Sequence, residues 1–252
     1  MPATPAWPPK SAPRLFVVQP LTAGSVVRIE GNPAHYLTRV MRAAPGDIVI
    51  LCDDITGEWA ARVSNVGKRD VTLEVVDHLR PREAVPDLWL CPALLKKDRF
   101  DLVLEKATEL GAARIAPLVT RRCVADKLNL DRARTITTEA AEQCARTALP
   151  QIAEPVKLEA LLAGWAENRR LFFADENARE EGGEPAAAAF SAHKRSPAAI
   201  LIGPEGGFDD AERAAIRSHP SAHAITLGPR ILRGETAAIA VLSVWMASAG
   251  DW

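Results

Sequence analysis

Two glycine-rich segments near the carboxyl end of the chain carry the residue types best suited to hold a small molecule. The first is Gly203-Pro-Glu-Gly-Gly-Phe208, and the second is Leu227-Gly-Pro-Arg-Ile-Leu-Arg-Gly-Glu-Thr236. Each segment leaves a strand-like apolar run through Gly-Pro and turns into a helix-like stretch. Because glycine lets the backbone approach a ligand closely, these two loops form the candidate binding site.

The charges around the first loop indicate which ligand suits it. A phosphate-binding loop has bare N–H groups and a lysine near the start of its helix. Here Glu205, Asp209, Asp210 and Glu212 crowd that place, and Asp209 with Glu212 makes a capping-box-like pair that occupies the free N–H groups. The loop therefore disfavours an anion and favours a neutral or cationic ligand, such as an adenosine that carries a sulfonium. Two tight turns without a ligand are the alternative interpretation.

Strands and helices alternate over the region that contains both loops. Strands are predicted at residues 88–94, 114–119, 171–174, 199–202 and 224–227, and helices at 98–110, 131–148, 209–218 and 235–249. This alternation predicts an α/β domain with a mainly parallel sheet that helices cover on both faces. Ligands of such sheets bind beyond the carboxyl ends of the strands, where both loops lie.

The amino-terminal part is predicted to consist mostly of strands. Strands are predicted at residues 14–18, 25–29, 48–52, 58–65 and 71–78, which gives a small barrel-like unit. Asn32 is expected to cap a helix that Pro33 begins. Tyr36, Leu37, Val40 and Met41 fall on one face of that helix, and Arg39 and Arg42 fall outside it. Residues 1–13 are expected to be a flexible tail, and residues 79–87 a linker.

Composition excludes several classes of protein. The chain has 252 residues, of which 48% are hydrophobic and 25% charged, and its net charge is −1. These values argue against a disordered or polybasic protein, and no apolar run is long enough to span a bilayer. A cytoplasmic protein without a membrane partner is expected. Residues 1–150 carry 21 Lys+Arg against 18 Asp+Glu, so nucleic acid is more easily bound there than by residues 151–252, which carry 10 against 14.

Cysteines and histidines show no metal-site pattern. Cys52, Cys91, Cys123 and Cys144 contain no C-x-x-C pair, and reduced thiols are expected. His219 and His223 are four residues apart, but Pro220 between them argues against a shared helical face. No metal is expected.

The motifs along nearly the whole chain resemble the 16S ribosomal RNA uracil-N3 methyltransferase family, a branch of the SPOUT (trefoil-knotted) S-adenosylmethionine-dependent methyltransferases. They are Arg14-Leu-Phe, His35-Tyr-Leu-Thr-Arg-Val-Met-Arg42 with Gly46-Asp47, Leu95-Lys-Lys-Asp-Arg99, Lys106-Ala-Thr-Glu-Leu-Gly111, Ile115-Ala-Pro-Leu118, Glu139-Ala-Ala-Glu-Gln143 and the two glycine-rich loops. The chain departs from the family at Lys97, Ala145 and Gly234, where members usually have Gly, Gly and Thr. None of these departures removes a group that the chemistry needs.

The resemblance implies a PUA-like β-barrel that binds RNA over residues 14–78 and a SPOUT α/β domain with a deep trefoil knot over residues 88–252. It also implies a homodimer, S-adenosylmethionine as cofactor in the knot, and 16S rRNA of the small ribosomal subunit as substrate. The nearly all-apolar stretch 237–244 is consistent with a helix buried on more than one side, in a dimer interface or in the core of a monomer.

Site residues follow from the positions of the motifs. The cofactor is expected to contact Ile202, Gly203, Pro204, Glu205, Gly206, Leu227, Gly228, Ile231, Leu232 and Thr236, with its adenine near 227–232 and its methionine end near 203–206. Arg233 is the candidate group to stabilise a uracil anion, and Glu235 the candidate to accept the N3 proton. A structural ion pair for Arg233 and helix-end charge pairing for Glu235 are the alternatives.

The RNA contacts are less specific. Arg14, Arg39, Arg42, Lys96, Lys97 and Arg99 are the candidate phosphate contacts, and the alternative for each is an ordinary solvated charge. Two other functions stay open: a methyltransferase for a ribose 2′-O or another base position, and a non-catalytic RNA-binding or assembly factor. The glycine-rich loops favour an enzyme, because a pure binding protein has no need of them.

Overall fold

The chain folds into two compact units. The computed structural model describes all residues except 1–6, 10, 176, 178–182 and 195. One unit is made by Met1–Ala84 and Ala141–Leu149, and the other by Val85–Ala140 and Pro150–Trp252. The chain therefore passes between the units three times, whereas the sequence predicted a single linker. No helix among the described residues has the length and hydropathy needed to cross a bilayer.

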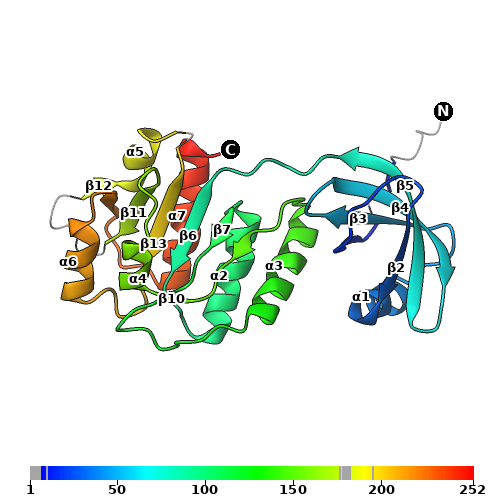
Figure 1. The fold of residues 1–252 in the computed structure, drawn as a ribbon, viewed down its shortest axis with the longest axis horizontal. Coiled ribbons are helices and arrows are strands. Elements are labelled where there is room, and N and C mark those ends of the chain that lie inside the picture. The colour runs from blue at the N-terminus through cyan, green and yellow to red at the C-terminus, as the bar shows by residue number, and fades with distance from the viewer. Residues whose placement is uncertain (1–6, 10, 176, 178–182, 195) are drawn as a thin grey trace. The chain divides into compact units, whose positions relative to one another are not determined.

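The first unit is built on a five-stranded sheet (Figure 1). Its strands are β1 (Arg14–Phe16), β2 (Val26–Glu30), β3 (Ile48–Asp53), β4 (Gly57–Val66) and β5 (Asp70–Arg80), in the order β1-β3-β4-β5-β2. β1 pairs with β3 in parallel, and the other pairs are antiparallel. Alternate residues of the strands, such as Val49 and Leu51, are fully buried and form the core of the unit with Leu37 and Leu73.

The helical segment of this unit differs from the prediction. Helix α1 (Gly31–His35) begins after Glu30, so Asn32 is not its N-cap, and it continues into a π-helical segment, η1 (Tyr36–Val40). Leu37 is buried as predicted, but the side chains of Val40 and Met41 are 62% and 38% exposed. The π-helix has more residues per turn than an α-helix, which rotates these two residues away from the core.

An ion cluster around the buried Glu58 attaches residues 141–149 to the first unit. The carboxylate of Glu58 accepts hydrogen bonds from Arg14 Nε at 2.9 Å and from Arg80. The same arginines donate to the main-chain oxygens of Glu142 and Ala145. Burial raises the pKa of Glu58, but the hydrogen bonds from Arg80 and Arg14 outweigh it and bring the pKa below its ordinary value.

The second unit contains a seven-stranded sheet in which all strand pairs are parallel. The strands are β6 (Leu88–Pro92), β7 (Arg114–Ile115), β9 (Gln151–Ile152), β11 (Arg170–Ala174), β12 (Glu184–Pro185), β13 (Ala198–Ile202) and β14 (Ala222–Thr226), in the order β12-β14-β11-β13-β6-β7-β9. The strand expected at 114–119 is divided into β7 and β8 (Leu118–Val119), and β8 pairs with β10 (Val156–Lys157). Pro117 lies between the two pieces and has no N–H for a ladder.

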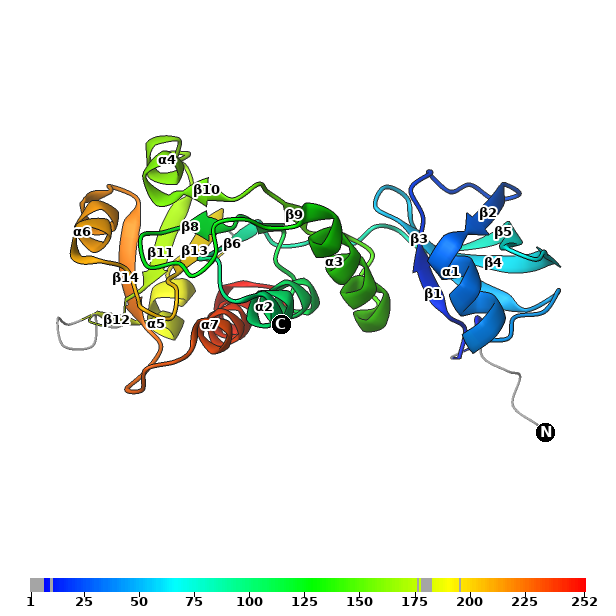
Figure 2. The same ribbon diagram turned by 90° about the horizontal axis from the view of Figure 1, so that it is seen from below.

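Helices cover both faces of this sheet, as predicted. Figure 2 shows α2 (Lys97–Glu109), α5 (Ala186–Ser191) and α7 (Gly234–Ala249) on one face, and α4 (Leu158–Ala163) and α6 (Asp210–Ser218) on the other. Residues of β13 alternate between the two cores: Ile200 packs with the first group of helices and Leu201 with the second. The central strands are therefore apolar throughout, which is typical of a buried parallel sheet.

Two helix ends differ from the sequence prediction. α2 begins one residue early and follows Lys96, so Asp98 lies in its first turn instead of capping it. Helix α3 (Leu130–Cys144) ends before Ala145, whose φ of +61° is outside the helical range, so it is shorter than the predicted 131–148. Gly111, with φ +86°, follows α2 as expected.

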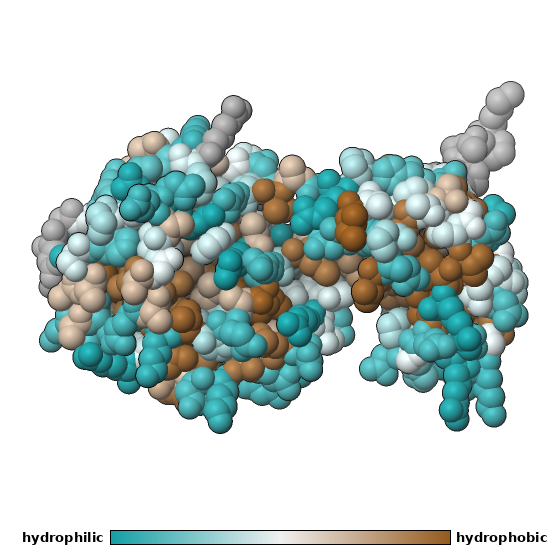
Figure 3. Space-filling model, in the orientation of Figure 1, coloured by the Kyte–Doolittle hydropathy of each residue, from teal (hydrophilic) through white to brown (hydrophobic). Residues whose placement is uncertain are grey.

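Exposed hydrophobic side chains are spread over the first unit, among them Val18, Val26 and Ile55. On the face shown in Figure 3, hydrophobic residues lie between hydrophilic ones. Scattered exposure of this kind is ordinary for a globular surface.

Candidate functional site

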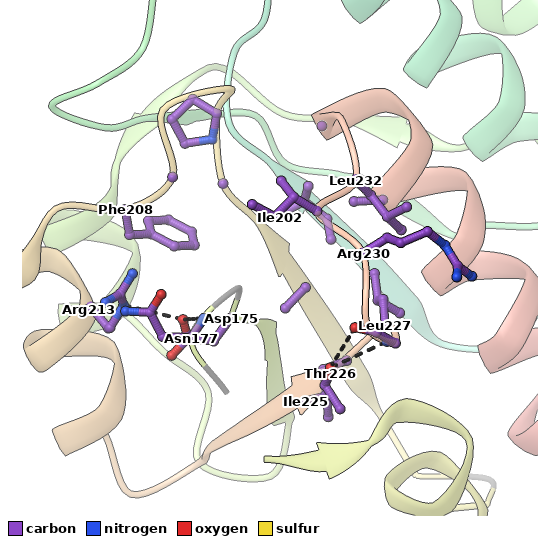
Figure 4. Close-up of a pocket in the computed structure, with 18 of the residues that line it drawn as sticks. Asp175, Asn177, Ile202, Phe208, Arg213, Ile225, Thr226, Leu227, Arg230 and Leu232 are labelled. Atoms are coloured by element: carbon purple, nitrogen blue, oxygen red, sulfur yellow. Dashed lines mark hydrogen bonds and ion pairs between the residues drawn. The ribbon is translucent and has the colours of Figure 1, made fainter. Parts of the chain in front are cut away.

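Three adjacent strands of the second unit end at one cavity. β14, β11 and β13 are neighbours in the sheet, and the segments that follow them surround a cavity of about 430 Å³ (Figure 4). The lining residues are Ala174, Asp175, Asn177, Ile202, Gly203, Pro204, Gly207, Phe208, Arg213, Ile225, Thr226, Leu227, Gly228, Pro229, Arg230, Ile231, Leu232, Gly234 and Ala237. The cavity lies where a parallel sheet is expected to bind its ligand.

Most of the residues proposed from the sequence to bind the cofactor line this cavity. They are Ile202, Gly203, Pro204, Leu227, Gly228, Ile231 and Leu232. Glu205, Gly206 and Thr236 are exposed and are not among the lining residues. The two glycine-rich loops therefore come together as the sequence predicted, but their outer residues face away from the cavity.

Sequence reasoning missed most of one wall of the cavity, where Asp175, Asn177 and Arg213 lie beside Phe208 of the first loop. Asp175 directly follows the strand that was predicted at 171–174, at the same edge of the sheet as both loops. That position was a usable signal, because the carboxyl ends of parallel strands lie together.

The first loop is supported by an arginine from the segment after β8. Arg122 Nη1 donates a hydrogen bond to the main-chain oxygen of Gly206 at 2.7 Å. The loop closes on itself where Gly207 N–H donates to the oxygen of Pro204 at 2.9 Å, and Phe208 is buried against Phe173. Side-chain and main-chain hydrogen bonds thus hold the loop in its observed conformation.

The capping box predicted for the next helix is present. Asp209 precedes α6 and accepts from Glu212 N–H, while the Glu212 carboxylate accepts from Asp209 N–H. The hydrogen bond from Glu212 N–H lowers the pKa of Asp209 below its ordinary value. Arg121 Nη1 lies 2.9 Å from Asp209 Oδ2 and offsets part of the negative charge that the sequence places here.

The second loop exposes more of its side chains. Gly228 has φ +100°, a conformation that a branched residue adopts only with strain, and a Cβ there would meet nothing within 4 Å. The Ile231 side chain is 87% exposed, and Arg230 and Arg233 are exposed as well. The loop thus exposes one aliphatic and two cationic side chains to solvent, and Arg230 and Ile231 also line the cavity.

Glu235 and Arg99 lie beside the cavity. The Glu235 side chain is 12% exposed, and its Oε1 lies 3.8 Å from Arg99 Nε. Its Oε2 is buried and has no hydrogen-bond partner among the residues that the structure describes. Arg99 Nη1 also lies 3.4 Å from Glu205 Oε1, so one guanidinium bridges the first loop and the start of α7. Gly234, which directly precedes Glu235 in the chain, lines the cavity.

The residues proposed to contact RNA fall into two groups. Arg14 and Arg99 are engaged with carboxylates, Arg14 with Glu58, so the structure does not support a phosphate contact for Arg14. Arg39, Arg42, Lys96 and Lys97 are exposed, and no ion pair is found for them within the described part of the chain. These four remain the candidate phosphate contacts.

The described residues contain no group of three metal-ligating side chains. The four cysteines are free thiols, of which Cys52 and Cys91 are buried. Burial raises the pKa of both thiols to about 12, so neither forms a nucleophilic thiolate at neutral pH.

Known proteins match both units. A family model described as RNA methyltransferase domain matches residues 82–246, and one described as RNA methyltransferase PUA domain matches residues 29–76. Ribosomal RNA small subunit methyltransferase E of Bacillus subtilis is 30% identical over 224 residues, which are 85% of this chain and 87% of that protein. The Rickettsia conorii protein of the same name is 29% identical over 231 residues, which are 91% of this chain and 93% of its own length.

Solved structures agree with these matches. A methyltransferase from Legionella pneumophila in complex with the bound cofactor SAM is 28% identical, with a TM-score of 0.83 over 96% of this chain and 99% of that one. Ribosomal RNA small subunit methyltransferase E from Neisseria gonorrhoeae, bound to S-adenosyl methionine, is 26% identical with the same TM-score and coverage. With its parallel sheet, its cavity between two glycine-rich loops and the match over residues 82–246, the chain belongs to the RNA methyltransferase family.

Proposed function

We propose that the chain is an S-adenosylmethionine-dependent methyltransferase that methylates N3 of a uridine in the 16S rRNA of the small ribosomal subunit. The observation that carries this proposal is the cavity at the carboxyl ends of β11, β13 and β14, which both glycine-rich loops line. The relatives named ribosomal RNA small subunit methyltransferase E, and the relative bound to S-adenosyl methionine, support the same function.

The residues present fit the cofactor. A volume of about 430 Å³ is within the usual range for a small-molecule site. Ile202, Leu227 and Leu232 give one wall an apolar character that suits an adenine, and Gly203 and Gly228 let the backbone come close to the ligand. When bound there, S-adenosylmethionine supplies an activated methyl group on its sulfonium.

Glu235 and Arg233 are the groups that we assign to the acceptor base. Uracil N3 carries a proton that must leave before the nitrogen can be methylated, and the buried Oε2 of Glu235 is suited to accept it. Arg233 is exposed at the start of α7, where its charge suits a uracil anion. Arg99 Nε lies 3.8 Å from the other oxygen of Glu235, close enough for its charge to favour the carboxylate form.

RNA binding is assigned to both units. The first unit, with Arg39 and Arg42, is proposed to be a PUA-like barrel that binds rRNA, and the match to the PUA model supports this. In the second unit, Lys96 and Lys97 are exposed cations at the start of α2 and are the candidate phosphate contacts there. Residues 88–252 then form the methyltransferase domain, and the enzyme works in the cytoplasm, where ribosomal subunits are assembled.

A trefoil knot and a homodimer are part of the same proposal. The start of α7 touches the first loop, since a Cβ on Gly234 would lie 3.5 Å from the Gly203 oxygen, which is consistent with a chain end threaded past that loop. Ile239 and Val244 of the apolar helix α7 remain partly exposed and are available to a second copy. Light scattering at micromolar protein concentration is expected to give the mass of a dimer, and a monomer mass contradicts it.

Nucleoside analysis of rRNA tests the function. Naked 16S rRNA and assembled small subunits from cells that lack the protein are incubated with it and S-adenosylmethionine, then digested and analysed by mass spectrometry. We expect one new 3-methyluridine in at least one substrate. A ribose-methylated nucleoside or another methylated base identifies a different methyltransferase. Failure of the protein to bind S-adenosylmethionine by calorimetry identifies a non-catalytic RNA-binding factor.

A further inference from the structure

A buried ion pair forms one wall of the cavity. Asp175 and Arg213 both line it, and their side chains are only 2% and 15% exposed. Arg213 Nε lies 3.3 Å from Asp175 Oδ1. Figure 4 shows this pair and Asn177 on the side of the cavity opposite Leu227 and Leu232.

The Asp175 carboxylate has a defined orientation. Its Oδ1 also accepts a hydrogen bond from Asn177 N–H at 3.1 Å, and its Oδ2 accepts one from Arg217 Nη2 at 2.7 Å. Arg217 belongs to the same helix, α6, but does not line the cavity. The carboxylate therefore lies between two arginines, of which only Arg213 reaches the cavity.

The cavity has one charged wall and one apolar wall. Among its described lining residues the charged ones are Asp175, Arg213 and Arg230, and Arg230 is exposed at the outer rim. The opposite wall is formed by aliphatic side chains. A ligand that fits has an apolar ring at one end and a group with both charges at the other.

Stability alone is a poor reason for such a pair. Removing two charges from water costs several kcal/mol per ion, and a buried pair seldom repays that cost better than apolar packing does. A pair that faces a cavity is instead suited to ligand recognition, because a guanidinium binds a carboxylate and a carboxylate binds an ammonium.

We propose that Arg213 and Asp175 bind the α-carboxylate and α-ammonium groups of the amino-acid end of S-adenosylmethionine. This inference rests on the proposed function and adds to it the residues that select the zwitterion. It differs from the sequence prediction, which put the methionine end at residues 203–206, since Glu205 and Gly206 do not line the cavity.

Ligands that lack part of the amino-acid end test the proposal. Decarboxylated S-adenosylmethionine lacks only the carboxylate, and 5′-methylthioadenosine lacks the whole zwitterion but keeps the adenosine. Calorimetry of Arg213→Gln is expected to show a 10- to 100-fold loss of affinity for S-adenosylmethionine, the size typical of a hydrogen bond to a charged group. Affinity for the two truncated ligands is expected to change less than about two-fold on the same grounds.

Three further variants complete the experiment. Arg213→Lys keeps the charge and is expected to recover part of the preference for the carboxylate. Arg217→Gln is the matched control, because it removes a partner of the same Asp175 without changing a cavity residue; it is expected to keep the wild-type preference. Asp175→Asn is expected to weaken both ligands that carry an ammonium relative to 5′-methylthioadenosine.

The outcomes separate this inference from the function on which it rests. If the wild-type chain binds none of the three ligands, the proposed function is wrong. If it binds them and Arg213→Gln weakens all three equally, or none, the ion pair is structural only and the inference is overturned.

Discussion

Glu235 is the residue whose environment most favours a chemical role. One of its oxygens lies 3.8 Å from Arg99 Nε, and the other is buried without a hydrogen-bond partner among the described residues. An acceptor with this geometry costs stability unless something later fills it. We propose that a ligand with a proton to donate fills this position, and helix-end charge pairing is the alternative that the next variant tests.

Replacing Glu235 by Gln tests this role. We expect the rate of methyl transfer to small-subunit rRNA to fall about 100-fold, the usual size of a general-base contribution. The affinity for S-adenosylmethionine, measured by calorimetry, is expected to stay unchanged. Asp98→Asn, an exposed carboxylate in the first turn of α2, is the control. Single-turnover rates equal to wild type would rule out Glu235 as the base.

Glu58 sets the acid stability of the first unit. Because its folded pKa is lowered, its contribution to stability is present above the unfolded pKa, about 4.3, and is lost as the pH falls below that value. We expect Glu58→Gln to cost roughly 3 kcal/mol at pH 7, since it leaves Arg14 and Arg80 without their buried partner. Its unfolding free energy should also decline less steeply below pH 4.5, as denaturant titrations can show. An equal loss in the exposed-site control Glu74→Gln would contradict this assignment.

At the scale of the elements, the first glycine-rich loop is supported by a residue from another segment of the chain, the one that follows β8. Arg122 donates to the Gly206 oxygen, whereas the adjacent Arg121 pairs with Asp209 at the start of α6. Two consecutive arginines thus support two different elements.

Replacing each of these arginines by alanine separates their roles. Arg122→Ala is expected to weaken cofactor binding about 10-fold, because the loss of one hydrogen bond from a charged group, about 1.5 kcal/mol, lets the loop depart from its observed conformation. Hydrogen exchange should become faster at residues 203–208. Arg121→Ala should lower helix stability slightly and leave cofactor affinity near wild type. The same affinity loss in both variants would show that general destabilisation is responsible.

The sequence predicted best those elements whose burial or capping leaves a clear pattern of residue types within a few consecutive positions. β13 reads as an unbroken apolar run because helices cover both of its faces, and the Asp209–Glu212 capping box is written within four residues. The segment around Val40 was predicted wrongly, since an apolar stripe drawn for an α-helix does not hold through a π-helical turn.

The candidate site was only half predictable for a related reason. Glycine and proline mark both loops in the sequence, so their meeting at one sheet edge followed from the alternation of strands and helices. Arg213 lies on α6 and reaches the cavity because α6 packs beside β14, and no local sequence pattern predicts that packing.

At the scale of the whole molecule, we propose that the exposed cations of the first unit contribute to the salt dependence of rRNA binding. Arg39 and Arg42 have no ion-pair partner among the described residues, so each is available to an RNA phosphate. The double variant Arg39→Ala, Arg42→Ala is expected to bind rRNA more weakly and to reduce the slope of log affinity against log salt by about 1.5.

The control for this double variant is Arg28→Ala, because Arg28 is already paired with Glu30 and Asp70. Filter binding of RNA at several salt concentrations gives the slopes, and calorimetry should show unchanged cofactor affinity in both variants. An unaltered slope in the double variant would place the RNA surface elsewhere, with Lys96 and Lys97 as the next residues to test.

The return of residues 141–149 to the first unit has a consequence for the nascent chain. During synthesis, residues 1–84 leave the ribosome well before Thr147, which donates a hydrogen bond to Glu83, has been made. In the same way, β6 is made long before β13, the strand with which it pairs. Domains made from one continuous stretch can finish folding one after another as they emerge. Here neither unit can be completed until much of the other has been translated, so their last folding steps overlap in time.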